Sequence, residues 1–414
     1  MALEGPIELV NLTQKDKLDF LSEGSYGCAF KKEEPKNRKT KVIVKIQKLN
    51  SGAIREDNIG KMIKKIPNYS LYFAPILKTN IITLGEVTDE EISKCTIITK
   101  EEDERQKYVT NRIKYVGKNT LGDFIYDVFE KKPKQFLRTF YTCYFDMLYN
   151  VYLLNKNGII HFDMKENNVI YSEEHERPVL IDFGLSIDTK SLTPDKFSEY
   201  FFVYGYDYPP WCFDASIISY AVYEFGENLD KELVTAEQVE KICNNFTNIN
   251  PLFFNDGETG HEDIFTDQEL LLYNKKLKEY LTPFIGAAWK LLINSQMKFI
   301  NTWDIYAVHV MFLLFVYHVH IDEYNNNKEF RFIQTYVSKL KREITALPTE
   351  RKSYEEIISE LTRDFGQSNR RGVEYMVKSV HKFSDNEEKM AAVKLKLDKL
   401  QLRELKREKR MFSL

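Results

Sequence analysis

The chain has 414 residues, a formal net charge of −3 at pH 7, 43% hydrophobic residues and 29% charged residues. A chain of this length is too long for one compact core, so we expect two lobes or domains and a tail. The charge balance excludes a global electric field that would attract nucleic acid or membrane.

Five scattered cysteines include no C-x-x-C pair. This pattern argues against a disulfide framework or a zinc site and favours a reducing intracellular compartment. The segment MALEGPIELV has neither the basic flank nor the long apolar core of a signal peptide. We therefore expect a cytoplasmic protein.

Up to about Gly117 the patterns are mostly those of strands. LDFLSEGSYGCAFKKE predicts two strands around a glycine turn, and TKVIVKIQKL predicts a third. AIREDNIGKMIKKI has apolar residues at helical spacing. Residues 95–99 and 112–116 predict two further strands.

From Thr120 onward the patterns are mainly helical. FIYDVF and KQFLRTFYTCYFDMLYNVYLL predict amphipathic helices, and NNVIY and PVLIDF predict short strands. Two later helices begin with capping-box spacing, at Thr235 and at Thr266. The apolar segment 306–321 is short for a bilayer span and predicts a buried core helix, and 390–414 predicts a charged helix.

A first group of residues suits the binding of phosphate. The turn GSYG at 24–27 joins two predicted strands, and its glycines allow the backbone to lie close over phosphate oxygens, although an ordinary hairpin would read the same. Lys45 is the only charge in the apolar strand VIVKI. Burial of its ammonium group costs desolvation free energy unless an anion lies beside it. Glu56, on one face of the next predicted helix, is its natural partner.

A second group suits phosphoryl transfer, which needs a positioned hydroxyl, a group that takes its proton and neutralisation of the phosphate charge. Asp163 and Asn168 lie in one loop of GIIHFDMKENNVIY, a spacing that can direct a carboxylate to a hydroxyl and an amide oxygen to a metal ion. Further on, the apolar strand VLI leads directly into Asp182-Phe183-Gly184, which suits a metal-binding turn.

Taken together, GSYGCAF, VIVK, HFDMKENN and DFG resemble the glycine-rich loop, phosphate-binding lysine, catalytic loop and magnesium loop of protein kinases, over residues 15–365. The resemblance implies an α+β bilobal kinase fold: a small β-rich N-lobe at 1–117, a large helical C-lobe at 118–385 and a basic helical tail at 386–414. It also implies transfer of the γ-phosphate of ATP to serine or threonine hydroxyls of protein substrates, with Mg²⁺ as cofactor.

The resemblance assigns a role to each motif residue. Asp163 is the base, Lys165 steadies the γ-phosphate and indicates a serine/threonine kinase, and Asn168 and Asp182 bind Mg²⁺. Lys45 pairs with Glu56 and holds the α- and β-phosphates. The residues expected to contact the nucleotide are Leu21, Ser22, Glu23, Gly24, Ser25, Tyr26, Gly27, Ala29, Lys45, Glu56, Val116 and Ile170.

Other motifs resemble parts that support the kinase site. IKYVGKNTLGDF resembles the hinge, with Ile113 as the gatekeeper and the backbone of Val116 facing adenine. His161 would be a structural prop under the magnesium loop. WDIYAVHV resembles the central helix of the C-lobe, with Asp304 as its anchor to the catalytic loop, and Arg351 resembles the arginine of the last subdomain.

The chain also departs from the family pattern. Ser22 replaces the first loop glycine, Phe162 replaces an arginine, and His309 replaces a glycine. The segment 209–211, Pro-Pro-Trp, stands in place of Ala-Pro-Glu, which leaves Arg351 without its expected carboxylate. Asp182 and Asp304 are 122 residues apart (304 − 182), so we expect a helical insertion at about 212–301.

Two departures give structural expectations. Phe162 has no donor for a phosphate on residues 186–208, so we expect its ring to pack on the aromatic residues of FFVYGYDYPPW and the enzyme to be active without that phosphate. The alternative is that another basic residue, such as Lys190 or Lys196, replaces the arginine. Ala29 is small and Ile43 is large where the family has valine and alanine, which reshapes the ceiling of the adenine pocket.

The departures look like those of divergent kinases from large cytoplasmic DNA viruses, which would place the protein in host cytoplasm or virion; a divergent protist kinase is the alternative. A pseudokinase scaffold would normally lack one of Lys45, Asp163, Asn168 and Asp182, and all are present. Small-molecule phosphotransferases share the catalytic loop but do not usually share all the motifs. The basic tail could bind an acidic partner, acidic lipid or nucleic acid, or pack its leucines on the kinase body.

Overall fold

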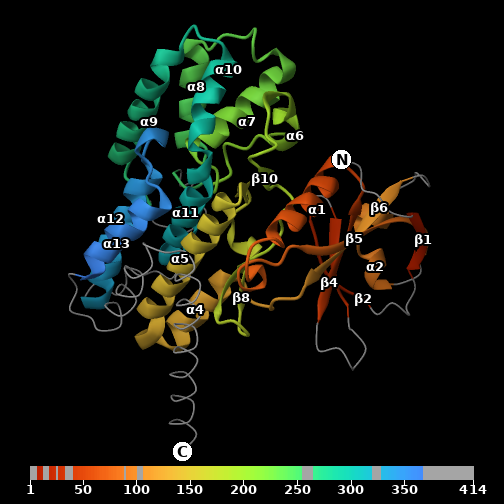
Figure 1. The fold of residues 1–414 in the computed structure, drawn as a ribbon. Coiled ribbons are helices and arrows are strands. Elements are labelled where there is room, and N and C mark those ends of the chain that lie inside the picture. Colours follow the sequence, from red (N-terminus) through yellow and green to blue (C-terminus); the bar gives the residue numbers. More distant parts are fainter. Residues whose placement is uncertain are drawn as a thin grey trace, which may run out of the picture.

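The computed structural model describes residues 7–12, 18–24, 27–32, 41–87, 90–99, 106–253, 264–318 and 328–366. An amino-terminal sheet is followed by a mainly helical part, so the expected α+β class is confirmed (Figure 1). The expected helix at 390–414, and Ser25 and Tyr26 of the glycine turn, lie outside the described residues.

Among the residues that the structure describes, six strands form the amino-terminal sheet in the order β1-β5-β6-β4-β3-β2. Strands β1 and β5 run parallel, and the other neighbouring pairs are antiparallel. The expected hairpin and third strand are β2, β3 and β4, and the strand expected at 112–116 is the end of β6. The strands are β1 (Ile7–Leu12), β2 (Leu18–Glu23), β3 (Gly27–Lys32), β4 (Val42–Lys48), β5 (Ile76–Val87) and β6 (Lys107–Lys114).

Helix α1 (Ser51–Ile63) lies between the sheet and the helical part (Figure 1). Its first turn is capped by Asn50, whose side chain accepts a hydrogen bond from the backbone N–H of Ala53 at 2.9 Å. Gly60 allows the helix to approach β5, because a Cβ at this position would lie 3.0 Å from the carbonyl oxygen of Ile76. The helix therefore has a fixed position over the sheet, and it carries Glu56 on its buried face.

The prediction of a strand at 95–99 is wrong, because this segment forms helix α3 (Thr96–Thr99), which follows helix α2 (Glu90–Ser93). Ile92, Cys95 and Ile98 recur at three-residue spacing, which is a helical period, and all three are buried in the core of the sheet. Cys95 is bonded there to Cys28 of β3. The expectation that the cysteines would form no disulfide is therefore also wrong for this pair.

The helical part contains the helices and strands that FIYDVF, KQFLRTFYTCYFDMLYNVYLL, NNVIY and PVLIDF predict. Its helices are α4 (Leu121–Lys131), α5 (Pro133–Lys156), α6 (Phe197–Tyr200), α7 (Phe213–Phe225), α8 (Ala236–Asn248), α9 (Asp267–Leu281), α10 (Trp289–Gln296), α11 (Trp303–His318), α12 (Lys328–Ile344) and α13 (Tyr354–Gly366). Its short strands are β7 (Ile159–Ile160), β8 (Val169–Ser172), β9 (Arg177–Leu180) and β10 (Ile187–Asp188).

The expected insertion is ordered where the structure describes it. Helices α7 to α10 lie together at one end of the helical part (Figure 1), and their buried side chains belong to the same core as those of α5. Thr235 and Thr266 cap α8 and α9, and both capping boxes are present as predicted. Helices α7 to α10 are thus an integral part of the helical core.

Helix α11 passes through the centre of this core, as expected of the apolar segment 306–321 up to His318. The continuous helical stretch Trp289–Tyr317 is long and apolar enough to cross a membrane, but 78% of its most apolar window is buried within the protein. The core helix of a globular protein satisfies the same test of length and composition.

Candidate active site

Lys45 lies on β4 with its ammonium group between two carboxylates. Its Nζ is 3.1 Å from Oε1 of Glu56 on α1 and 3.1 Å from Oδ1 of Asp182. Gln47 fixes the buried Glu56 further, since its Nε2 donates a hydrogen bond to Oε2 at 3.0 Å. Burial opposes the charge of Lys45, but the two carboxylates outweigh burial and raise its pKa above the ordinary value.

Asp182 follows β9 and has a φ of 57°, which is uncommon for a residue other than glycine. Phe183 is buried beside it, with ring centroids 6.3 Å from Phe73 and 5.0 Å from His161. Desolvation opposes ionisation of Asp182, but the ammonium of Lys45 holds the pKa of this carboxyl below its usual value. The side chain remains 46% exposed, so a charged carboxylate stays accessible at this turn.

The loop between β7 and β8 brings together Asp163, Lys165 and Asn168. Nδ2 of Asn168 donates to Oδ2 of Asp163 at 2.7 Å and to its backbone carbonyl at 2.8 Å. Nζ of Lys165 lies 3.1 Å from the same Oδ2. Because the amide nitrogen of Asn168 faces Asp163, its amide oxygen is left for another ligand.

This loop is held by Asp304 on α11. The buried carboxylate of Asp304 accepts hydrogen bonds from the backbone N–H groups of His161 at 2.6 Å and of Phe162 at 3.0 Å. Nε2 of His161 lies 3.0 Å from the carbonyl oxygen of Ile181, just before Asp182. The anchor and the prop that the resemblance implies are thus both present in the geometry.

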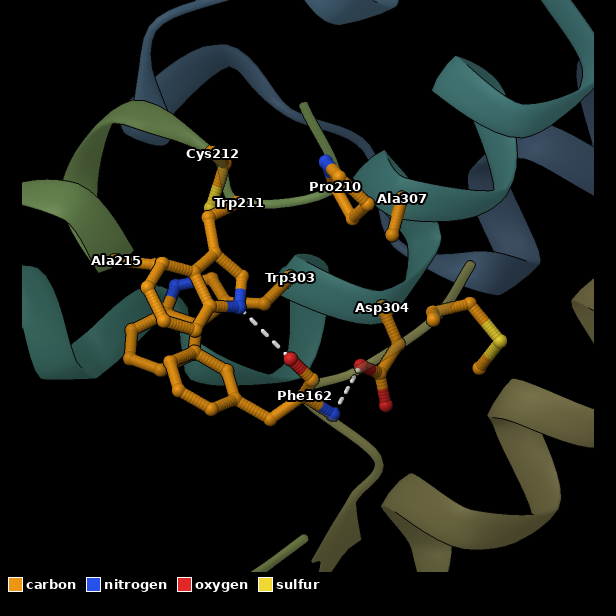
Figure 2. Close-up of a pocket in the computed structure, with 9 residues that line it drawn as sticks. Phe162, Pro210, Trp211, Cys212, Ala215, Trp303, Asp304 and Ala307 are labelled. Carbon is orange, nitrogen blue, oxygen red and sulfur yellow. Dashed lines mark hydrogen bonds between the residues drawn. The ribbon is translucent and has the colours of Figure 1, made fainter. Parts of the chain in front are cut away.

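Phe162 packs as expected against the aromatic segment (Figure 2). Its ring stacks on Trp211 with centroids 4.8 Å apart. It also meets the ring of Phe201 edge-on at 5.6 Å. Nε1 of Trp211 donates to the carbonyl oxygen of Phe162 at 2.8 Å. These contacts hold Phe162 at a φ of 64° and tie the loop to the aromatic segment.

Sequence patterns did not single out Tyr208, which touches Asp163 directly. The hydroxyl of Tyr208 donates a hydrogen bond to Oδ1 of Asp163, and burial and the Asp163 carboxylate raise the pKa of this hydroxyl. Nζ of Lys165 lies 5.9 Å from the centroid of the Tyr208 ring. The only sequence signal was its place in the aromatic run FFVYGYDYPPW.

The expected phosphate loop lies at the turn between β2 and β3. Gly27 packs tightly on β4, since a Cβ there would lie 2.6 Å from Cβ of Gln47. Glu23 turns toward α3, where its Oε2 accepts a hydrogen bond from the backbone N–H of Thr96 at 2.8 Å. The exposed members of the turn are Leu21, Ser22, Glu23 and Gly24.

The residues expected around adenine lie on neighbouring elements. Ala29 of β3 pairs with Lys45 of β4, and Ile43 of β4 pairs with Ile113 of β6. The segment that contains Val116 then passes β8, since a Cβ on Gly117 would lie 3.3 Å from Cγ2 of Ile170. All five expected residues are partly exposed. They are Ala29, Ile43, Ile113, Val116 and Ile170.

Arg351 has a carboxylate partner, which corrects the expectation from Pro-Pro-Trp at 209–211. Its guanidinium forms an ion pair with Oδ1 of Asp214, and the two side chains are 5% and 0% exposed. Nε1 of Trp303 donates to Oδ2 of Asp214 at 2.6 Å. Asp214 is the one charge in the apolar stretch WCFDASIISYAV, and that signal could have found it.

The oxygen ligands at this site fit a divalent cation, because Mg²⁺ prefers carboxylate and amide oxygens such as those of Asp182 and Asn168. A second group, Glu23, Cys28 and Cys95, has ligand atoms within 4.8 Å of one another. There the two sulfurs are bonded to each other and are not available as thiolate ligands.

No protein-family model matches the chain, and no curated protein sequence shows significant similarity to it. Function is therefore proposed from the four motifs and from the geometry of the residues that carry them.

Proposed function

We propose that this chain is a bilobal serine/threonine protein kinase. The observation that carries the proposal is the bonding of Lys45 to both Glu56 and Asp182, with Asp163 bonded to Asn168 and Lys165 in the adjoining loop. Three motifs that lie far apart in the sequence, VIVK, HFDMKENN and DFG, thus supply two lysines, two aspartates and an amide in one region, as phosphoryl transfer requires.

Each residue has a defined part in this reaction. Lys45, oriented by Glu56, binds the phosphates of ATP, and Lys165 steadies the phosphoryl group that is transferred. Asp163 accepts the proton of the substrate hydroxyl, and Asn168 fixes the direction of its carboxylate. Mg²⁺, which Asn168 and Asp182 would hold, supplies neutralisation of the phosphate charge.

The ordered state of the site favours an enzyme over a scaffold. Lys45 contacts Glu56 and Asp182, Asp163 contacts Asn168 and Lys165, and Phe183 is buried. A scaffold that had lost catalysis would have no need to maintain this set. The Lys165 side chain, two residues after the base, supports serine and threonine as acceptors.

Three substitutions test the proposal: Lys45→Met, Asp163→Asn and Asp182→Asn. Each should reduce transfer of phosphate from ATP to a mixture of serine- and threonine-containing proteins by about 10²–10⁴-fold, because each removes charge stabilisation or the base. Circular dichroism checks that the variants remain folded. The matched controls are Lys107→Met on the exposed part of β6 and Asp127→Asn on the surface of α4.

Both controls should retain nearly full activity, since exposed charges contribute little. A site variant that keeps more than about a tenth of wild-type activity, a loss of only ~1.4 kcal/mol, would contradict the role assigned to that residue. Small-molecule acceptors in the same assay separate a protein kinase from a small-molecule phosphotransferase.

A further inference from the structure

Both oxygens of the Asp163 carboxylate have partners from this chain. Oδ2 accepts from Asn168 and lies beside Lys165, whereas Oδ1 accepts from the hydroxyl of Tyr208. A general base must lie within hydrogen-bonding reach of the proton that it removes. By this criterion, the hydroxyl of Tyr208 has the position of a phosphoryl acceptor.

Aromatic contacts fix Tyr208 in this place. Its ring meets Trp211 edge-on, with centroids 5.1 Å apart. Trp211 is fixed in turn by stacking on Phe162 and by its hydrogen bond to the carbonyl oxygen of Phe162, one residue before Asp163 (Figure 2). The hydroxyl is therefore positioned from the same loop that carries the base.

We propose that Tyr208 is an intramolecular phosphoryl acceptor, which the active site of the same molecule phosphorylates. The inference rests on the proposed kinase function, with ATP as the donor. Asp163 takes the proton from Tyr208 Oη, a bond forms between Oη and the γ-phosphorus, and the bond from that phosphorus to the β–γ bridging oxygen breaks. ADP leaves with that oxygen.

Phosphorylation of Tyr208 removes the hydrogen bond to Asp163 that positions its hydroxyl. A phosphorylated Tyr208 has no hydroxyl proton to donate, and its phosphate carries between one and a half and two negative charges near the Asp163 carboxylate. The two groups therefore repel each other, and Phe162 provides no cation that could hold the phosphate. The cation beside the ring, Lys165, lies 5.9 Å from the Tyr208 ring centroid and is already paired with Oδ2 of Asp163. One turnover in cis thus removes Tyr208 from the base and leaves Oδ1 available to substrate hydroxyls. This inference departs from the expectation that the enzyme is active without phosphate on residues 186–208.

Mass spectrometry of the full-length protein tests the inference. The protein is treated with a phosphatase, freed of it, and incubated with Mg²⁺ and ATP over a wide range of protein concentration. We expect one phosphate on Tyr208, formed with a rate constant that does not depend on protein concentration. Tyr208→Phe should lose this phosphate, and the matched control Tyr206→Phe, whose ring contacts Tyr204, should keep it.

Asp163→Asn should gain no phosphate on Tyr208, even when it is mixed with wild-type protein. A rate that rises in proportion to protein concentration, or labelling of that variant by the wild type, would overturn the intramolecular step. Phosphorylation of added proteins without any phosphate on Tyr208 would overturn the inference and leave the kinase function standing. Absence of both ATP binding and transfer to every acceptor would overturn the kinase function itself.

Discussion

Two single residues, Phe162 and Asp182, have strained backbones next to the groups that would perform the chemistry. A non-glycine residue held in a sparsely populated conformation costs about 1–3 kcal/mol and persists only where its surroundings fix it. Asp304 and Trp211 fix Phe162, and Lys45 bonds the side chain of Asp182. The strain thus lies at the two positions that orient the loops of the site.

Ile43 gives a prediction about the size of the expected adenine pocket. Ile43 stands opposite Ile113 in the register of β4 and β6, and a smaller side chain at this position would leave more space. We expect Ile43→Ala to increase the affinity for bulky ATP-site inhibitors about 10-fold, or ~1.4 kcal/mol, while ATP still binds. Isothermal titration calorimetry measures both affinities.

The matched control for this prediction is Val44→Ala. Its side chain lies on the other face of β4 and packs on the core that contains Cys28. This variant should lose stability without a gain in inhibitor affinity. Equal inhibitor affinity in wild type and Ile43→Ala would contradict the prediction that Ile43 limits the pocket.

At the scale of elements, local periodicity predicted the helices and strands whose own sequence has a clear hydrophobic pattern. It identified α1, α5, the β2–β3 hairpin and the two capping boxes. Strand β5 was not predicted, and its pairing with β6 shifts register near its start, between Ile76 and Lys78. At 95–99 the β-branched residues suggested a strand, whereas burial against the sheet selected the helical spacing of Ile92, Cys95 and Ile98.

The ion pair of Asp214 and Arg351 joins the start of α7 to the segment before α13. Both side chains are buried, so removal of one charge leaves the other without compensation. Asp214→Asn keeps an acceptor for Trp303 but should lower the free energy of unfolding by about 3–5 kcal/mol. Urea denaturation monitored by tryptophan fluorescence measures the change.

Two further variants test whether the loss of stability comes from the uncompensated buried charge of this ion pair. Asp230→Asn removes an exposed ion pair with Lys290 and should cost less than about 1 kcal/mol. The double variant Asp214→Leu with Arg351→Met removes both buried charges and should recover much of the stability lost in Asp214→Asn. A loss in Asp214→Asn no larger than that in Asp230→Asn would show that the buried pair does not tie the insertion to the core.

At the scale of the whole molecule, the sequence predicted the sheet-then-helix order and the residues of the four motifs. It could not predict contacts between segments that lie far apart in the sequence, because no local pattern links such segments. The disulfide joins residues 67 positions apart, and Tyr208 reaches Asp163 across 45 positions. Such contacts depend on how the elements pack together, and periodicity contains no information about that packing.

The stability of the whole molecule should depend on pH through His309 in the central helix α11. His309 is 3% exposed, and its Nε2 has no hydrogen-bond partner among the described residues. Burial lowers its pKa from 6.5 to about 4, with smaller and opposing effects of Glu343 and Lys352. Between these two pKa values the unfolded chain binds a proton that the folded protein does not bind, so stability falls as pH falls.

This linkage gives a magnitude that can be measured. From pH 7 to pH 5 the wild type should lose about 2 kcal/mol of unfolding free energy through this histidine alone. His309→Phe keeps a planar ring beside Tyr144 and removes the titration, so it should show a correspondingly smaller loss in urea denaturation at the two pH values. His175→Gln is the control, because that side chain is 21% exposed and should contribute less. An unchanged loss in His309→Phe would mean that the buried histidine does not bind a proton on unfolding in this range, and that carboxylates elsewhere produce the acid sensitivity.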